Sequence, residues 1–283
     1  MPGIKGIVRN VIRYTTVNPI HHTTREEDND FFITVSIANY AQFNSGLVST
    51  PLTGLLTALY LYPMDDRSAE ILEAVIQEFI NGGEPISSGL LYERHDFGIK
   101  PAMIRLELDA LESAGYLEQP HHSAGRVPTD SGYEFFAKQM LGSVPESREN
   151  RLKELFEERA WPDLLRELSE ELGMLGVIAD LSREMVYKAG LEQLIKNLDY
   201  EGREEMNAVI HDFEAMDARL PHAAENMREG PNVFIGKKSP VTKSENLSVV
   251  GGNFIIDGVT ITIFAIGPKR MDYKKTIRIF KSL

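Results

Sequence analysis

Hydrophobic residues recur at helical spacing between residues 68 and 111, and this pattern predicts three short helices. The first is an amphipathic helix over residues 68–81 that ends at Gly82-Gly83; its apolar stripe is Ile71, Leu72, Val75, Ile76 and Phe79. Ser87 and Ser88 are good N-cap residues for a second helix that runs to Arg94. Pro101 suits the first position of a third helix, whose inward stripe is Ile104, Leu108 and Leu111.

A short β pattern follows these helices. Residues 116–118 are predicted to form a strand, residues 121–125 a loop, and Arg126 lies on the returning strand. Residues 131–140 then predict another helix, with Tyr133 and Phe136 facing the core. Helices followed by a ribbon are the plan of a winged helix-turn-helix, in which one helix enters the major groove of DNA.

The second half of the chain changes from helical to strand periodicity. Residues 148–228 are acidic and have leucine-rich helical spacing, which predicts helices. Their apolar residues are typical of bundle or core packing, and the alternative is that part of this surface makes a dimer contact. Residues 232–236 predict a strand, and residues 247–256 and 259–266 predict a hairpin joined by Asp257-Gly258. Asp272 can cap a last helix over residues 273–280. We therefore expect an α+β chain with a winged helix-turn-helix at its N-terminal end and a sensor-like α/β domain after it.

The predicted winged helix-turn-helix is acidic overall, which affects how we expect it to bind DNA. The chain of 283 residues carries a formal net charge of −12, and residues 64–141 hold six cations against fourteen acids. Bulk affinity for DNA comes from neutralised phosphates, so we expect few phosphate contacts and a shallow dependence of binding on salt. Residues 231–283 are basic, with nine cations against three acids. Two alternatives are open for Lys269, Arg270, Lys274 and Lys275: they lie on a solvated helix face, or they dock onto the acidic residues 64–141.

The cations of the acidic segment gather in the predicted motif. Lys100, Met103 and Arg105 lie in the first turns of the third helix, which suits entry of that end into a major groove. Arg126 is placed where a wing reaches a phosphate or the minor groove. The candidate DNA-binding residues are Ser87, Ser88, Arg94, Lys100, Pro101, Met103, Arg105, His122, Ser123, Gly125 and Arg126.

Several runs of residues carry a resemblance to a known family. They are residues 83–85, Pro101-Ala102 with Ile104-Arg105, Leu111-Glu112 with residues 115–121, and residues 123–130 with Gly132-Tyr133. Near the C-terminal end, Ile235-Gly236, residues 247–250 and residues 266–273 continue it. The chain resembles HrcA, the family of bacterial heat-inducible transcription repressors, from about residue 67 to residue 283.

The resemblance implies a function and a domain plan. It implies a cytoplasmic repressor that binds double-stranded DNA at an inverted repeat before chaperone operons as a homodimer, that depends on the GroE chaperonin, and that heat relieves. It also implies a GAF-like effector domain, which is shortened here because the strands and inserted dimerisation domain usual in the family are not recognisable in the middle of the chain. Gly89, Lys100, Met103 and Leu106 stand where the family commonly has Arg, Ser, Thr and Asn, which predicts a variant operator.

The expected domains follow from these matches. Residues 1–63 have no counterpart and are expected to be an extended start-site assignment or a disordered arm. Residues 64–141 form the winged helix, residues 142–147 a linker, and residues 148–283 the helical and GAF-like effector and dimerisation domain. The apolar stretch within residues 46–63 is short for a membrane span, so no membrane partner is expected.

The sequence gives no clear signal for a disulfide, a metal site, another cofactor or a catalytic site. The chain has no cysteine, which excludes disulfide and thiolate chemistry and fits a reducing cytoplasm. Adjacent His121 and His122 lack spaced partner ligands, so we expect neither a metal nor another cofactor. No nucleophile, base or phosphate cradle stands out, so an enzyme is not expected. The alternatives are a ligand-gated winged-helix regulator and a winged helix used for protein–protein contacts.

Overall fold

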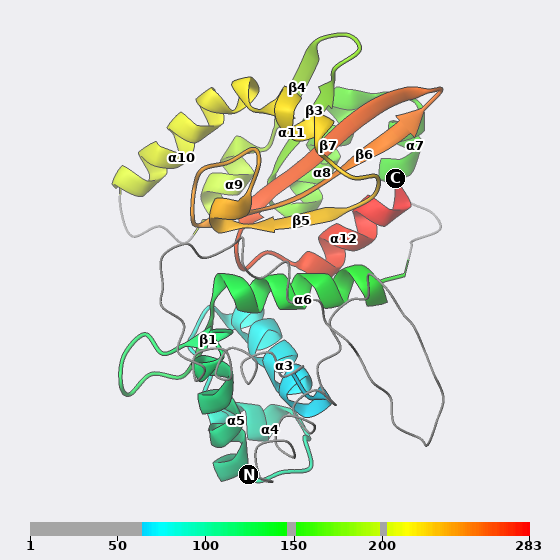
Figure 1. Ribbon diagram of the computed structural model, residues 1–283. Coiled ribbons are helices and arrows are strands. Elements are labelled where there is room, and N and C mark those ends of the chain that lie inside the picture. Colours follow the sequence, from blue (N-terminus) through cyan, green and yellow to red (C-terminus); the bar gives the residue numbers. More distant parts are fainter. Residues whose placement is uncertain (1–63, 146–150, 199–202) are drawn as a thin grey trace, which may run out of the picture. The chain divides into compact units, whose positions relative to one another are not determined.

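The computed structural model describes residues 64–145, 151–198 and 203–283 (Figure 1). Residues 66–283 form a compact unit of helices and an antiparallel sheet, which confirms the predicted α+β class. The proposed extension over residues 1–63 lies outside the described residues. In the described part of the chain, no helix has both the length and the apolar character needed to cross a bilayer.

The first described elements are three helices: α3 (Asp66–Gly82), α4 (Ser88–Arg94) and α5 (Pro101–Ser113). Each matches a helix predicted from the sequence, α3 and α5 from the spacing of their apolar residues and α4 from its N-cap serines. Ser87 is the N-cap of α4, and its hydroxyl accepts a hydrogen bond from the Leu90 amide at 3.1 Å. Pro101 begins α5, and Gly115 lies just beyond its end with φ of 80°, a conformation that glycine adopts without strain.

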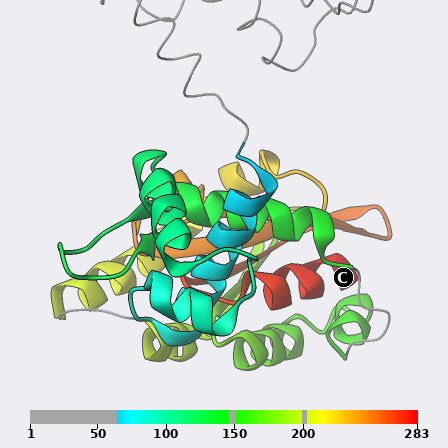
Figure 2. The ribbon, with the colours of Figure 1, turned by 90° about the horizontal axis from the view of Figure 1, so that it is seen from below.

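A two-stranded ribbon follows α5. Strands β1 (Leu117–Glu118) and β2 (Val127–Pro128) pair antiparallel, and the loop between them projects beyond the helices (Figures 1 and 2). Arg126 lies one residue before β2 rather than in it, and its backbone bridges Ile86 through hydrogen bonds of 2.8 and 2.9 Å. The ribbon is therefore attached at its far end to the segment that leads into α4.

The remaining elements build one sheet and the helices around it. The helices are α6 (Asp130–Ser143), α7 (Arg151–Glu157), α8 (Trp161–Leu172), α9 (Leu191–Asn197), α10 (Arg203–Ala215), α11 (Leu220–Glu225) and α12 (Tyr273–Ser282), with 3-10 turns η2 (Met216–Ala218) and η3 (Gly236–Lys238). The strands are β3 (Leu175–Asp180), β4 (Met185–Ala189), β5 (Asn232–Ile235), β6 (Leu247–Ile256) and β7 (Val259–Pro268). All neighbours are antiparallel in the order β4-β3-β7-β6-β5.

Successive side chains along each strand point to opposite faces of the sheet, and helices cover both faces. Leu175, Val177, Val249, Phe264 and Ile266 share one buried cluster with residues of α9, α10 and α11. The opposite face contacts α8 and α12: Gly176 lies beside Leu165, and Tyr273 of α12 lies 3.0 Å from the Ser248 hydroxyl. The predicted hairpin is confirmed, since Asp257 and Gly258 both have positive φ, as a type I′ turn requires.

The prediction that residues 148–228 are helical was wrong for residues 175–189. These residues form the β3–β4 hairpin, which completes the sheet. Every residue of β3 is buried, so the strand lacks the polar and apolar alternation that marks a strand with one wet face. The strands that appeared to be lost from the middle of the chain are therefore partly present.

Helix α6 connects the N-terminal helices to the sheet. It packs against α3 and β2 on one side and against β5 and α12 on the other. The rings of Tyr133 and Phe136 contact Tyr273, with centroids 6.0 and 6.1 Å apart. The helix also continues to Ser143, into the predicted linker, and Val144 is buried. The division of the chain at residues 142–147 stays a prediction.

Basic residues of the last third bind α6, as the docking alternative predicts for Lys269. Its ammonium group pairs with Asp130, and Lys238 pairs with Glu134 at 2.6 Å. Lys281 donates to the Leu141 and Val144 carbonyl oxygens at 2.8 and 2.7 Å, which satisfies the C-terminal end of α6. Lys275 instead pairs with Glu171 of α8.

Candidate nucleic-acid interface

A polar groove of about 430 Å³ lies between the start of α4, one side of α5 and the loop between β1 and β2. Seven of the eleven predicted DNA-binding residues line it: Ser87, Ser88, Arg105, His122, Ser123, Gly125 and Arg126. The structure thus brings together residues that are up to 39 positions apart in the sequence. Arg94, Lys100, Pro101 and Met103 lie outside this groove.

Helix α5 presents an outer face opposite its buried stripe. Lys100 is the N-cap residue, and both Lys100 and Arg105 are exposed. Neither cation has an ion-pair partner within residues 64–145, 151–198 and 203–283. The acids of α5 are engaged instead: Glu107 accepts a hydrogen bond from Ser68 at 2.9 Å, and Asp109 and Glu112 bind Arg126. Although the segment is acidic overall, the acids of α5 bind other residues, so Lys100 and Arg105 remain available to bind a partner.

Arg126 differs from the expectation for a wing cation. Its guanidinium lies 2.7 Å from Asp109 and 2.8 Å from Glu112, and its side chain is only 14% exposed. The two carboxylates hold the arginine against α5 and so fix the ribbon to that helix. A phosphate or minor-groove contact by Arg126 stays a prediction, and such a contact has to compete with the two carboxylates for the guanidinium.

The loop between β1 and β2 is held by its own contacts. The Gln119 amide donates to the His122 and Ala124 carbonyl oxygens at 3.2 and 2.8 Å, while His122 and Ser123 are exposed. Gly125 passes so close to Ile86 that a Cβ on it would lie 2.7 Å from the Ile86 nitrogen. Sequence reasoning missed Gln119, Asp109 and Glu112, because nothing local indicates that they hold the loop and Arg126.

The two serines before α4 have different surroundings. Ser87 is exposed, and its hydroxyl caps the helix, whereas Ser88 is the first residue of α4 and is buried. Only Ser87 therefore combines the capping role with a position open to a partner.

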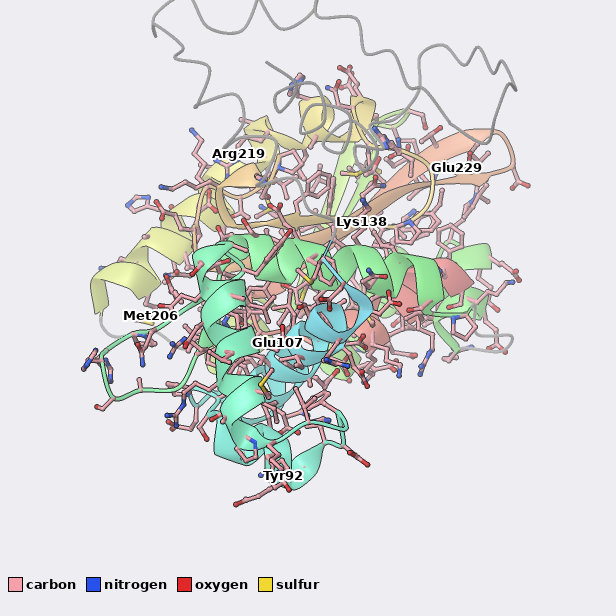
Figure 3. All side chains as sticks on the ribbon, turned by 60° about the horizontal axis from the view of Figure 1, so that its bottom comes forward. Tyr92, Glu107, Lys138, Met206, Arg219 and Glu229 are labelled. Atoms are coloured by element: carbon pink, nitrogen blue, oxygen red, sulfur yellow. The ribbon has the colours of Figure 1, made fainter. Side chains whose placement is uncertain are left out.

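Tyr92 lies on the same helix and points away from the fold (Figure 3).

Arg94 is exposed at the end of α4 but pairs with Glu78 of α3, which also lies 3.0 Å from His95 Nε2. Burial raises the pKa of Glu78, but hydrogen bonds from His95 and Arg94 outweigh burial and leave the pKa below its ordinary value. The ionised carboxylate therefore fastens α3 to the end of α4.

This contact predicts a pH dependence of stability. A carboxylate with a lowered folded pKa stabilises the fold fully above its unfolded value, about 4.3, and the stabilisation is lost as the pH falls through the folded pKa. Between about pH 5 and 3, the free energy of unfolding should thus fall more steeply for the natural chain than for Glu78→Gln, as measured by urea denaturation. Glu73→Gln removes an exposed acid of the same helix and is the control. Parallel curves for the natural chain and Glu78→Gln would contradict the prediction.

Among the described residues, no group of three or more His, Asp or Glu side chains is placed to hold a metal ion. His121 and His122 lie in the exposed loop between β1 and β2.

Comparison with known proteins identifies the family. A family model described as the HrcA protein C-terminal domain matches residues 133–277, just over half of the chain. The chain belongs to the HrcA family. The matched residues include most of α6, the whole sheet and the first half of α12, so the match rests on the second half of the fold.

Curated relatives in this family bear the same name. The chain is 46% identical over 88 residues to the heat-inducible transcription repressor HrcA of Frankia casuarinae, and 44% identical over 88 residues to that of Thermobifida fusca. Each match covers 31% of this chain and 26% of the relative, so the chain matches about a quarter of the length of these HrcA proteins. Both relatives are named as heat-inducible transcription repressors, the family that the sequence resembles.

A solved structure shares the fold. A crystal structure described as that of a hypothetical protein superposes with a TM-score of 0.62 at 19% sequence identity, over 77% of this chain and 94% of that chain. At this identity the likeness concerns the fold alone. It shows that helices and a sheet in this arrangement occur together in a protein of known structure.

Proposed function

We propose that this HrcA-family chain is a sequence-specific DNA-binding transcription repressor of chaperone operons. In this proposal α3, α4 and α5 with the β1–β2 ribbon are a winged helix-turn-helix, α5 is the recognition helix, and the loop between β1 and β2 is the wing. The observation that carries it is the exposure of Lys100 and Arg105 on the outer face of α5 without ion-pair partners among the described residues. Family membership and the names of the curated relatives support it.

The arrangement suits major-groove entry. A recognition helix places its N-terminal residues against base edges, and Lys100 and Arg105 occupy the first two turns of α5. Arginine binds guanine through two hydrogen bonds to O6 and N7, so we assign this contact to Arg105. Ser87, at the start of α4, and Ser123, in the loop, are exposed hydroxyls on the same groove and would bind phosphate.

The second half of the chain would regulate this binding. We propose that the five-stranded sheet and its helices are a shortened GAF-like effector domain, and that two copies bind an inverted repeat, because a two-fold operator matches a two-fold dimer. By the family resemblance, the active form depends on the GroE chaperonin, and heat relieves repression in the cytoplasm. The contacts of α6 with α3, β5 and α12 offer a physical link between the two halves.

The test is binding of the purified full chain to a duplex that carries an inverted repeat from in front of chaperonin genes. We expect specific retardation in a gel shift, no shift with a scrambled duplex, and an affinity that falls with salt much less steeply than the slope of about −10 known for a strong repressor. Failure to distinguish any inverted repeat from scrambled DNA would refute the proposal.

Arg105→Ala should lower the affinity for the operator about 5- to 150-fold, because a bidentate base contact contributes about 1–3 kcal/mol. Fluorescence anisotropy with labelled operator measures the change. Arg278→Ala removes an exposed arginine of α12 and is the charge-matched control, with unchanged affinity expected. Equal affinities of Arg105→Ala and the natural chain would show that Arg105 reads no base.

A protein partner is the second candidate for the same surface. Tyr92, Met103 and Leu106 are 53%, 46% and 60% exposed, and the surrounding segment is acidic. Exposed apolar side chains in such a setting also occur at protein–protein contacts. This candidate predicts a chain that binds no duplex in the gel shift and associates through this surface instead.

A further inference from the structure

The outer face of α5 has an apolar centre. Ala102, Leu106 and Ala110 recur every four residues and are exposed, and Met103 lies beside them on the next ridge. Leu106 is 60% exposed and Met103 is 46% exposed, although both are large apolar side chains. The helix already buries a complete stripe of Ile104, Leu108 and Leu111, so Met103 and Leu106 are not needed for packing within the described part of the chain.

Cations frame this apolar centre. Lys100 lies at the N-terminal end of α5, and Arg105 lies on the side that faces the groove. Both are exposed, and the acids of α5 on that side are held by Arg126. A polyanion drawn to these two cations would therefore meet Leu106 and Met103 between them. This charge arrangement favours a polyanion such as a duplex over a basic or neutral protein surface as the occupant.

We propose that Leu106 and Met103 determine sequence specificity by contacting the 5-methyl groups of thymine in the major groove. This inference rests on the proposed function. In the major groove thymine presents its methyl group, the only apolar feature among the base edges there, and apolar side chains contact it. Neither side chain can donate a hydrogen bond to a base or a phosphate, so each can gain free energy from DNA chiefly by covering apolar surface. The operator half-site should accordingly hold thymine next to the guanine that Arg105 reads.

The test removes only the methyl groups. The full chain selects its preferred duplexes from a random pool, and the best duplex is then synthesised with deoxyuridine in place of thymine, one position at a time. Deoxyuridine pairs as thymine does but lacks the 5-methyl group. We expect one or two positions in each half-site where the replacement lowers affinity about fourfold, the effect of burying one methyl-sized group, and no effect at the others.

Substitutions of Leu106 and Met103 test whether these two side chains cause the discrimination between thymine and deoxyuridine. Leu106→Ala and Met103→Ala should each bind thymine and deoxyuridine duplexes equally at the position that the missing side chain covers. Ile255→Ala truncates a side chain that is 63% exposed at the β6–β7 hairpin, and it should keep the natural discrimination. Circular dichroism confirms that each variant is folded.

The outcomes separate this inference from the proposed function. Enrichment of no duplex would overturn the proposed function itself. Enrichment of a duplex that the natural chain binds equally with thymine or deoxyuridine at every position would overturn the thymine contact and leave DNA binding standing. Unaltered discrimination in both Leu106→Ala and Met103→Ala would assign methyl recognition to other residues and overturn the inference. The first comparison uses only the natural chain, so it does not depend on the folding of a variant.

Discussion

Gly125→Ala should lower the free energy of unfolding by about 3 kcal/mol and detach the β1–β2 ribbon from α4. The new Cβ would lie 2.7 Å from the Ile86 nitrogen and still closer to its carbonyl group, and backbone atoms cannot move aside as a flexible side chain can. Relief requires loss of the two backbone hydrogen bonds between Ile86 and Arg126. Overpacking costs about 1–3 kcal/mol, and each lost hydrogen bond about 0.5–1.5 kcal/mol.

Urea denaturation measures the stability change, and hydrogen exchange of the Ile86 and Arg126 amides measures the detachment. Both amides should exchange far faster in Gly125→Ala than in the natural chain. Gly82→Ala is the matched control, because a Cβ at Gly82 has no neighbour within 4 Å and the residue ends a helix. Protected amides and unchanged stability in Gly125→Ala would mean that the ribbon does not need this close approach. On the proposed function, detachment also misplaces the wing and weakens operator binding.

Tyr273→Ala should cost about 3–5 kcal/mol of unfolding free energy, the range for truncating a buried aromatic residue. Tyr273 is fully buried, and its ring contacts Tyr133 and Phe136 of α6. Its hydroxyl donates to the Lys269 carbonyl at 2.6 Å and lies 3.0 Å from the Ser248 hydroxyl. Burial raises the pKa of Tyr273 well above its ordinary value, so the hydroxyl keeps its proton and remains a donor.

Tyr273→Phe distinguishes the contribution of the ring to stability from that of the hydroxyl. It keeps the contacts with α6 but leaves the Lys269 carbonyl without this donor, so a smaller loss of about 1–3 kcal/mol is expected. Urea denaturation of both variants gives the comparison. If Tyr273→Ala lost no more stability than Tyr273→Phe, the aromatic contacts would not be what fastens α12 to α6.

These contacts explain why a change in the sheet could reach the N-terminal helices. Tyr273 and Lys269 belong to the C-terminal end of the chain, yet they bind α6, which also packs on α3 and β2. A regulatory signal therefore has a short physical route, through one helix, from the proposed effector domain to the proposed DNA-binding elements. Any such coupling requires two arrangements of α6 with different free energies.

Local patterns were sufficient for the helices and the late hairpin. The stripe in α3, the proline that begins α5 and the Asp257-Gly258 turn each act within a few residues, so their structure can be predicted from short segments. The β3–β4 hairpin could not be predicted this way. Leu175–Asp180 is covered by α8 on one face and by α9 and α11 on the other, and burial on both faces removes the alternation.

The same division applies to the candidate interface. The sequence by itself determined the α+β class, the positions of Lys100 and Arg105 at the start of a helix, and the family, because these depend on residue order and short spacing. Only the tertiary structure decided which cations are free. Arg126 is bound by Asp109 and Glu112 from another element, while Leu106 and Met103 remain exposed because Ile104, Leu108 and Leu111 already fill the core. Ion pairs and burial are decided by which distant segments meet, and no local pattern encodes that.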